Sequence, residues 1–473
     1  MKALIQQAAN LAIIFCAITA LPASEVRSPN VLWIYAEDQS PLLSCYGVGV
    51  NVTPVIDQLA ADGVRFANAF MPAPVCSATR SGLMVGAMPT TFGLHNHRSS
   101  RTADSMIPLP AEVKTVPELF KQAGYYTFNV GKDDYNFEYD REALYDGPYS
   151  LRFWQGHKGA AIDWNARRGD QPFFGQIQLA GGKHGGKIEP IDLSMVELPP
   201  YYPEHPVIRK GWARHYDTAR IMDREVGEII ARLKKDGLLE NTIVFVFSDH
   251  GFNNGLRDKQ FCYDGGLHVP LIVTWYGNPE ALRSGDARLD LVNGIDISAT
   301  SLALAGLPIP EYMEGENLFD PEYHRDFVIG VRDRCDFTID RIRTVRTERF
   351  RYVRNFMTDR PYMQPQYRDG KSYTKVLKQL YAEGKMNEQQ AWFFAEERPE
   401  HEFYDLEKDP HQTVNVAANA DYADELKRHQ QILNDWIIKT DDKGQYSEGQ
   451  ASLTATKKRW KEKCVNPEYQ DLK

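Results

Sequence analysis

The sequence lacks an excess of positive charge, internal repeats and low-complexity tracts. Its formal net charge at pH 7 is -9, because 55 Lys and Arg residues stand against 64 Asp and Glu residues. A chain of this sign is not expected to bind nucleic acid in general, and an anionic substrate would need a local basic pocket. Its 473 residues, 42% of them hydrophobic, suit a globular protein of two or three domains.

Long apolar runs are also lacking beyond the N-terminus, so we expect no membrane-spanning helix. Lys2 precedes an apolar run over residues 11–21, and Pro22-Ala23-Ser24 follows it. This pattern predicts a secretory signal peptide over residues 1–23 that is cleaved near Ala23, although a buried N-terminal helix is an alternative. The mature protein is therefore expected to be exported, either to the periplasm or to the medium.

Cysteine is scarce, and the spacing of the cysteines does not suggest a metal site. The chain has six of them: Cys16, Cys45, Cys76, Cys262, Cys335 and Cys464. Cys16 falls within the predicted signal peptide, and Cys76 lies in a motif described below. One or two disulfides among the other four fit an oxidising compartment, but the sequence does not pair them.

Apolar runs of strand length alternate with amphipathic segments through the first two thirds of the chain. The expected strands cover residues 30–35, 126–130, 172–179, 242–247 and 269–274, and the expected helices cover 54–59, 115–123, 212–235 and a run that follows Cys76. This alternation predicts an α/β fold with a large, mostly parallel central sheet and helices on both faces.

The pattern changes after about residue 325. Short β-like runs at 342–345, 350–353 and 402–406 precede an amphipathic helix at 421–439. We therefore expect a domain over residues 24–325 and a smaller C-terminal α+β unit over 326–473 with an antiparallel sheet. The segment 360–400 is either an insertion near the substrate or a plain surface excursion.

Polar residues follow four of the expected strands, where ligands bind in sheets of this kind. They are Glu37-Asp38, Lys132, His184 and Asp249-His250. The carboxylates suit a hard divalent cation. Helix caps or solvated loop charges are the alternative for each pair, but delivery from four segments to one edge favours a single site.

The most informative motif is Cys76-Ser77-Ala78-Thr79-Arg80, just before an expected helix. The start of a helix stabilises an anion, and Arg80 lies about one turn further on. Together these features suit an oxyanion such as sulfate or phosphate. A buried structural cysteine beside a surface arginine is the alternative.

This stretch resembles the signature of the type I, formylglycine-dependent sulfatases of the alkaline phosphatase-like superfamily. Residues 343–347 and 402–410 are similar to that family's C-terminal landmarks, especially in the glycosaminoglycan and heparan N-sulfatase (sulfamidase) group. Ala78 stands where the family usually has proline. The resemblance implies that a formylglycine-generating or anaerobic sulfatase-maturating enzyme oxidises Cys76 to formylglycine, whose hydrate is the nucleophile.

The resemblance also implies roles for individual residues. It places one Ca²⁺ ion, or another divalent metal, on Glu37, Asp38, Cys76, Asp249 and His250. It assigns catalysis to Cys76, Arg80, Lys132, His184 and Lys259, with weaker substrate contacts at His95, His97, Arg98 and Arg257. Asp134 stands where the family commonly has a second histidine. We expect Lys259 to face the sulfuryl group rather than the core, with Arg257 as the competing candidate.

The implied activity is hydrolysis of a sulfate ester or N-sulfate on a sulfated carbohydrate, such as a glycosaminoglycan or algal polysaccharide fragment. The first alternative is a phosphodiesterase or phosphonate monoester hydrolase of the same superfamily. The second is a non-catalytic, carbohydrate-binding relative whose Cys76 is never oxidised. The intact set of Cys76, Arg80, Lys132 and Lys259 speaks against the second alternative.

Overall fold

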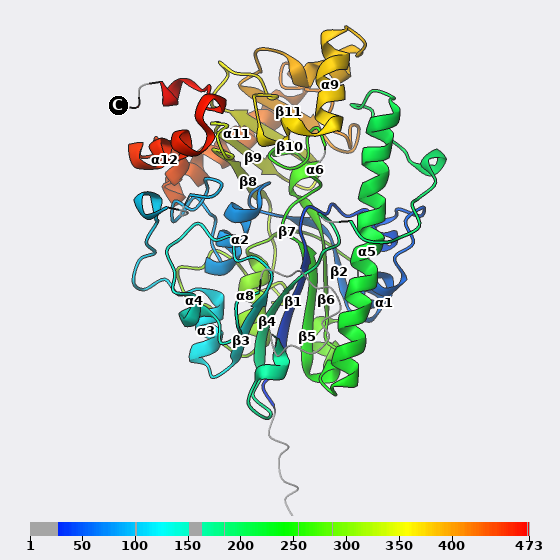
Figure 1. Ribbon diagram of the computed structural model, residues 1–473, viewed down its shortest axis with the longest axis vertical. Helices are drawn as coiled ribbons and strands as arrows, with labels where there is room; N and C mark the ends of the chain where they lie inside the picture. Colours follow the sequence, from blue (N-terminus) through cyan, green and yellow to red (C-terminus); the bar gives the residue numbers. More distant parts are fainter. Residues whose placement is uncertain are drawn as a thin grey trace, which may run out of the picture.

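Two sheets organise the chain, the larger below and the smaller above in Figure 1. The computed structural model describes residues 27–99, 102–150, 163–183, 185–253, 255–285, 287–470 and 472. The predicted signal peptide and its cleavage site therefore lie outside the described residues. Within these ranges, no helix combines the length and the apolar character that a bilayer span requires.

The larger sheet has the strand order β3-β4-β1-β5-β6-β2-β7. Its strands are β1 (Asn30–Ala36), β2 (Val64–Phe70), β3 (Tyr126–Val130), β4 (Phe173–Gln178), β5 (Thr242–Ser248), β6 (His268–Thr274) and β7 (Ala287–Asn293). The pairs β3–β4, β4–β1, β1–β5 and β2–β7 are parallel. The central strand β1 is buried along its whole length, as its continuous apolar run predicts.

Helices cover both faces of this sheet. They are α1 (Pro54–Asp62), α2 (Cys76–Val85), α3 (Val116–Gln122), α4 (Arg141–Leu144), α5 (Pro206–Lys235), α6 (Asp264–Leu267), α7 (Pro279–Leu282) and α8 (Asp296–Leu304). One face packs Trp33 and Phe245 against α2, α3 and α8, while the other packs Leu32 and Val244 against α1 and α5. The predicted fold class is confirmed.

Strand β6 runs antiparallel to both of its neighbours, β5 and β2. The sequence predicts a strand there but does not reveal its direction. A parallel strand needs a crossover that returns the chain to the far edge of the sheet. Among the described residues between β5 and β6, the chain forms only the four-residue helix α6. The chain therefore enters β6 at the end of the sheet where β5 finishes, and β6 runs antiparallel to β5.

The smaller sheet is fully antiparallel, in the order β11-β10-β9-β8. Its strands are β8 (Val328–Arg332), β9 (Ile342–Arg346), β10 (Phe350–Asn355) and β11 (His401–Asp405), and the helices of this part are α9 (Ser372–Ala382), α10 (Glu388–Ala391), α11 (Ala423–Thr440) and α12 (Gln450–Trp460). Strand β8 begins three residues after the predicted domain boundary, which stays a prediction.

The start of α2 lies between the two sheets. Val75 and Ala78 pack in the cluster that contains β8, β10 and α11, whereas Leu83 and Met84 pack in the core of the larger sheet. Both sheets therefore fix the position of Cys76. All five cysteines among the described residues are free thiols, so the disulfides considered from composition are not present there.

Candidate active site

The ends of β1 and β5 bring two acidic segments together. Ala36 pairs with Ser248 in register, so the residues that follow each strand emerge side by side. The backbone N–H of Asp38 donates to Asp249 Oδ1 at 3.2 Å. Asp38 has a positive φ of 67°, a left-handed backbone conformation that is uncommon for residues other than glycine. Register therefore explains why carboxylates 211 residues apart in sequence share one site.

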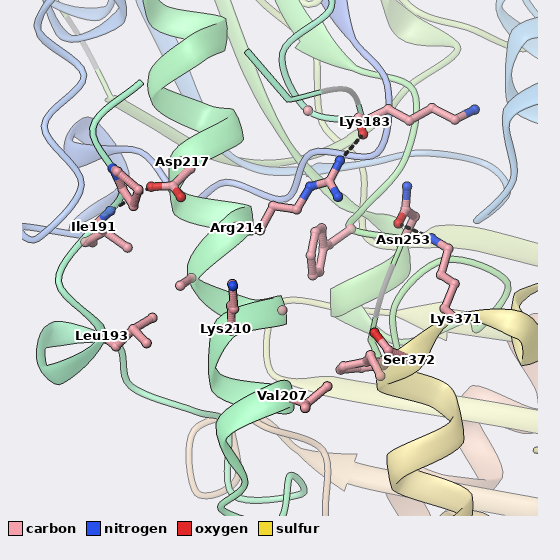
Figure 2. Close-up of a pocket in the computed structure, with 16 residues that line it drawn as sticks. Lys183, Ile191, Leu193, Val207, Lys210, Arg214, Asp217, Asn253, Lys371 and Ser372 are labelled. Carbon is pink, nitrogen blue, oxygen red and sulfur yellow. Dashed lines mark hydrogen bonds between the residues drawn. The ribbon is translucent and has the colours of Figure 1, made fainter. Parts of the chain in front are cut away.

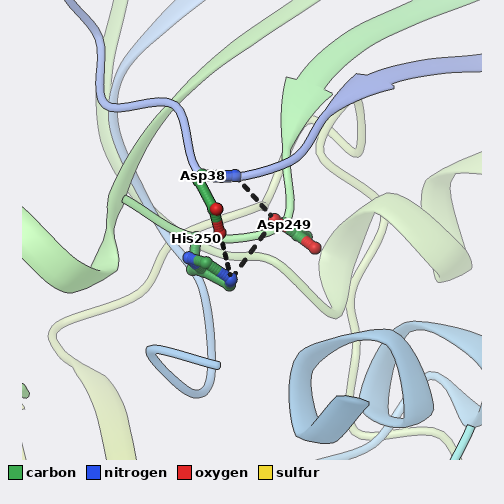
Figure 3. A group of neighbouring side chains, drawn as sticks. All are labelled: Asp38, Asp249 and His250. Atoms are coloured by element: carbon green, nitrogen blue, oxygen red, sulfur yellow. Dashed lines mark hydrogen bonds and ion pairs between the residues drawn. The ribbon is translucent and has the colours of Figure 1, made fainter. Parts of the chain in front are cut away.

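Three side chains at this edge converge closely enough to bind a divalent cation. Candidate ligand atoms of Asp38, Asp249 and His250 all lie within 4.8 Å of one another, and Figure 3 shows the three groups facing a common point. His250 Nε2 lies 3.1 Å from Asp38 Oδ1 and 3.6 Å from Asp249 Oδ1. All three side chains are fully buried. Two carboxylates and one imidazole therefore fit a small dication.

Glu37 occupies a different environment from these three groups. Its Oε1 accepts hydrogen bonds from Lys132 and, at 2.9 Å, from Lys183. Its Oε2 is buried and has no hydrogen-bond partner among the described residues. Burial would raise the pKa of Glu37, but the Lys132 ammonium brings that pKa down to about 2. Lys132 also contacts Asp134 at 3.0 Å. Of the two carboxylate oxygens of Glu37, Oε2 is therefore the one without a bonding partner among the described residues.

The loop after β4 approaches Glu37 through a glycine. Gly182 has a φ of +96°, and a Cβ atom on it would lie 2.3 Å from the Glu37 carbonyl oxygen. Only glycine accommodates both the left-handed backbone and this close approach. The loop thereby carries Lys183, the next residue, to the Glu37 carboxylate.

Cys76 is the first residue of α2, whereas the sequence analysis expects the helix to follow it, and Cys76 is 1% exposed. Its Sγ lies 3.6 Å from His97 Nε2. Burial alone would raise the pKa of the Cys76 thiol. The ammonium groups of Lys132 and Lys259, with hydrogen bonds from His250 and His97, instead hold this pKa well below its ordinary value. The pocket around Cys76 therefore stabilises negative charge at its side-chain position.

Arg80 lies one turn into α2 and is buried beneath the site. Its Nε and Nη2 donate to Asp249 Oδ2 at 3.1 and 2.9 Å, and its Nη1 donates to the Tyr35 hydroxyl at 2.8 Å. This guanidinium holds Asp249 in place. The alternative of a surface arginine is wrong, because Arg80 is only 2% exposed.

Lys259 reaches the site, but it is not a surface residue. Its Nζ lies 2.7 Å from Asp38 Oδ1, and the residue is 2% exposed. Burial would lower the pKa of Lys259, but the charge of Asp38 holds it well above its ordinary value. The expectation that Lys259 stands apart from the core is therefore wrong. A cationic side chain that binds a buried carboxylate is itself drawn into the interior.

Arg257 does not join the cluster. Its guanidinium lies over the rings of Tyr201, Tyr263, Trp392 and Phe393, at centroid distances of 5.6, 4.5, 4.9 and 5.6 Å. It also donates to the Gln412 carbonyl. Because aromatic rings surround its guanidinium, Arg257 has a structural role. The carboxylates of Glu37, Asp38 and Asp249 form what we call the acidic cluster. Lys259 is then the residue of this loop that contacts the acidic cluster, through Asp38.

The three residues proposed after the motif helix divide into two groups. His97 contacts Cys76 through Nε2, and its Nδ1 lies 3.4 Å from Asp336 Oδ2. Arg98 Nη1 lies 3.6 Å from Asp336 Oδ1. His95 instead lines a separate cavity with Asp333, Arg334 and Glu448. The structure thus gathers His97 and Arg98 beside Cys76 but not His95. His184 lies outside the described residues.

Three contributors were missed from the sequence: Lys183, Asn253 and Asp336. Lys183 directly precedes His184 in the sequence, and His184 was selected because it follows a strand, so the same signal could have found Lys183. Asn253 donates to Asp38 Oδ2 and lies four residues beyond Asp249. Asp336 comes from the loop between β8 and β9 and carries no local signal, because its contact with His97 spans the two sheets.

Comparisons with known proteins bear on the family and the fold of the chain. A family model described as Sulfatase matches residues 29–307, and one described as N-sulphoglucosamine sulphohydrolase, C-terminal, matches residues 251–393. An ulvan-active sulfatase of Formosa agariphila is 30% identical, over 88% of this chain and 75% of its own length.

Two solved structures show the same fold. One, in complex with its substrate D-glucosamine-2-N,6-O-disulfate, gives a TM-score of 0.64 at 17% identity and covers 88% of this chain and 99% of that chain. The phosphonate monoester hydrolase of Agrobacterium radiobacter gives a TM-score of 0.59 at 19% identity, with coverages of 87% and 96%. At these identities the two structures speak for the fold alone.

Proposed function

The chain belongs to the sulfatase family, and from that premise we propose that it hydrolyses sulfate esters or N-sulfates of a sulfated carbohydrate. The observation that carries the proposal is the position of Cys76. It begins a helix, is buried, and is surrounded by His97, Lys132, Lys259 and the acidic cluster. The substrate class is supported by the ulvan-active relative, which is 30% identical over 88% of this chain.

Two groups complete the proposed site. A divalent cation, Ca²⁺ in our proposal, would be held by Asp38, Asp249 and His250, with Glu37 Oε2 and the side chain of residue 76 as further ligands. Such an ion supplies Lewis-acid stabilisation of negative charge. Conversion of Cys76 to formylglycine supplies a geminal diol in place of a thiol.

The residues of the chain have distinct tasks in this proposal. Lys132 and Lys259 place positive charge beside residue 76, where the transferred sulfuryl oxygens gather charge. Arg80 is a positioning residue, because its guanidinium is engaged by Asp249 and Tyr35. His97, held by Asp336, is placed to exchange a proton with the side chain of residue 76. His184 stays our candidate for protonating the leaving group.

The proposal extends to maturation and location. We propose that residues 1–23 direct export to the periplasm or the medium, where sulfated polysaccharides are degraded. A formylglycine-generating or anaerobic sulfatase-maturating enzyme is the partner that Cys76 requires. The catalytic unit is proposed to span residues 24–325, and the C-terminal unit 326–473 contributes Asp336 to the site.

The test is sulfate release from heparan, chondroitin and ulvan oligosaccharides by protein from a host that converts the cysteine. Peptide mass spectrometry should show the aldehyde form at position 76. Loss of activity in Cys76→Ala and on chelation would agree with the proposal. Full activity from protein that carries only the thiol would contradict it, and so would a normal rate after metal removal.

Phosphonate ester hydrolysis is the second candidate, favoured by the shared fold of the phosphonate monoester hydrolase. Parallel assays on 4-nitrophenyl sulfate and on phenyl phosphonate esters separate the two activities. Faster turnover of the phosphonate would replace sulfatase as the main activity. A protein that binds these saccharides but never carries formylglycine would instead be the non-catalytic relative.

A further inference from the structure

A large basic cleft opens beside the acidic cluster. Its volume is about 950 Å³, and it lies between the first half of α5, the loop over residues 190–193 and the start of α9. Figure 2 shows Lys210 and Arg214 on α5, with Lys371 and Ser372 on the other side. This volume is at the upper end of small-molecule sites, about 300–1,000 Å³, and exceeds what one sulfate group needs.

The lining of the cleft is strongly cationic. Four of its residues carry positive charge, namely Lys183, Lys210, Arg214 and Lys371. Among the described lining residues, Asp217 is the sole carboxylate. It is already bound by Arg220 at 2.5 Å and by the backbone N–H of Ile191 at 2.9 Å. The cleft therefore has a net positive charge on a chain whose formal charge is -9.

Two of these cations are not neutralised by the protein. Within the ranges that the structure describes, neither Lys210 nor Arg214 forms an ion pair with a carboxylate, and both residues are exposed. Arg214 Nη2 donates to the Lys183 carbonyl at 3.4 Å, which leaves its other N–H groups free to bind a ligand. A guanidinium fixed at one end and open at the other suits a carboxylate or a sulfate.

The cleft is continuous with the acidic cluster. Lys371 Nζ donates to Asn253 Oδ1 at 2.9 Å, and Asn253 in turn donates to Asp38. Lys183 lines the cleft while its Nζ binds Glu37 at 2.9 Å. A chain of sugars with one sulfate at Cys76 would thus extend its next residue into the cleft.

Two aromatic side chains, which are themselves largely buried, form part of the wall of the cleft. Phe252 stacks on His215 with ring centroids 3.8 Å apart, and Tyr373 is fixed by its hydroxyl against Tyr202 at 3.1 Å. Both aromatic residues line the cleft. Buried neighbours hold these rings in place, so they require little ordering on binding.

We propose that this cleft is a second anion subsite, which binds a carboxylate or sulfate on the sugar next to the one that loses its sulfate. The inference rests on the proposed sulfatase activity and narrows the substrate to a polyanionic oligosaccharide. Arg214 and Lys210 are the specificity-determining residues. The segment 360–400, left open in the sequence between an insertion near the substrate and a plain excursion, lies at this subsite through Lys371 and Tyr373.

The test compares Arg214→Ala with Arg224→Ala. Arg224 is a matched control: it is also exposed on α5 and donates to a carbonyl of the same loop, Lys187 O at 3.0 Å, but does not line the cleft. The probes are tetrasaccharides from ulvan and from heparan sulfate, in native, carboxyl-reduced and singly desulfated forms. Arg214→Ala should lower kcat/KM on the native probes about tenfold, mainly through KM, and Arg224→Ala less than twofold.

The modified probes identify the anion. If a carboxylate occupies the subsite, the Arg214→Ala effect disappears on the carboxyl-reduced probe; if a sulfate does, it disappears on the probe that lacks the neighbouring sulfate. An equal effect on every probe would overturn the proposal, and so would an Arg214→Ala variant that matches the control. Lys210→Ala repeats the comparison with a second cation.

A binding experiment separates this inference from the activity. Cys76→Ala protein cannot turn over, and calorimetry with the native and carboxyl-reduced probes measures the subsite directly. About tenfold weaker binding in Cys76→Ala/Arg214→Ala, on the native probe alone, supports a carboxylate subsite even if no sulfate is released. Sulfate release that does not depend on the neighbouring anion would leave the sulfatase proposal standing and remove the subsite.

Discussion

The acidic cluster and the basic cleft are built from the same kinds of side chain under opposite physical conditions. In the cluster, Asp38, Asp249 and Lys259 are at most 2% exposed, and each binds an oppositely charged group. In the cleft, Lys210 and Arg214 are exposed and have no such partner among the described residues. Buried pairs position reacting groups and are costly to break, whereas open cations contribute little to folding and are available to a ligand.

The largest effect is expected at Asp249. Asp249→Ala leaves the Arg80 guanidinium buried without its carboxylate, so stability should fall by about 4–5 kcal/mol. Activity should also be lost, because a proposed metal ligand is gone. Chemical unfolding and sulfate release measure the two effects. Asp290→Ala, which removes a partly exposed pair with Arg288, is the control and should cost less than about 1 kcal/mol. If Asp249→Ala and Asp290→Ala lost the same unfolding free energy, the proposed difference between buried and exposed ion pairs would be wrong.

Lys259 should show the next largest effect. Lys259→Ala leaves the buried Asp38 carboxylate without its cationic partner. We therefore expect the free energy of unfolding to fall by about 3 kcal/mol and kcat to fall by a factor of about 10²–10³. Lys259→Met keeps the volume but not the charge and should lose nearly as much. Bound metal could replace part of the missing charge, so unfolding is measured with and without chelator. A stability change below about 0.5 kcal/mol would restore the expectation of a surface lysine.

Asp336 tests a smaller, pH-dependent pair. Burial would raise its pKa, but His97 and Arg98 bring it down to about 2 from 3.8. A depressed carboxyl pKa stabilises the fold above the unfolded pKa, and this contribution is lost as pH falls from about 4 to 2. Asp336→Asn should therefore lose about 2 kcal/mol at pH 7 and progressively less below pH 4.

The same substitution should slow turnover about tenfold and alter the pH profile of kcat/KM, because His97 loses its partner. The exposed pair of His324 and Asp326, 3.1 Å apart, supplies the control Asp326→Asn. If Asp336→Asn alters stability but not the pH profile, then Asp336 is structural only.

The smallest effect is expected at Glu225, where the substitution should increase stability rather than reduce it. Glu225 on α5 accepts the Gly181 N–H at 2.9 Å and has no ion-pair partner among the described residues. Burial raises its pKa from 4.5 to about 7. Its ionised form therefore destabilises the fold above pH 7, and the penalty is absent below pH 4.5. Glu225→Gln should raise Tm by about 2 °C at pH 8 and not at pH 4.5. Glu228→Gln, on the exposed face of α5, is the control and should leave Tm unchanged at both pH values.

Local sequence was sufficient where one residue type dominates a segment. The strands β1 and β5 were predicted because their apolar runs are continuous, and β3 and β4 because aromatic and β-branched residues recur in them between polar residues and glycine. Strands β2 and β7 were missed because Arg65, Asn68 and Asp290 interrupt their patterns, and β8 because Gly330 and Arg332 do. Helix α5 begins at Pro206, six residues before the prediction, because Arg209-Lys210-Gly211 interrupts the apolar pattern ahead of Trp212.

The site residues that could be predicted from the sequence are those that directly follow a strand or begin a helix. Asp38, Asp249, His250 and Cys76 each stand at the end of a strand or the start of a helix. The sequence did not show that Lys259 is buried, because its burial follows from the fold around Asp38. The sequence also did not indicate Asp336, because its partner His97 lies 239 residues earlier in the chain.

The burial of Cys76 imposes an order of events during biosynthesis. All ten residues of α2 are buried, so an enzyme cannot take the thiol into its own active site once the chain has folded. In our proposal, oxidation must therefore precede folding, and every molecule that folds early is permanently inactive. Purified folded protein with an unmodified Cys76 should resist added maturating enzyme, whereas an unfolded peptide that spans residues 70–86 should be converted. Efficient conversion of the folded thiol would show that α2 opens far more often than its packing suggests.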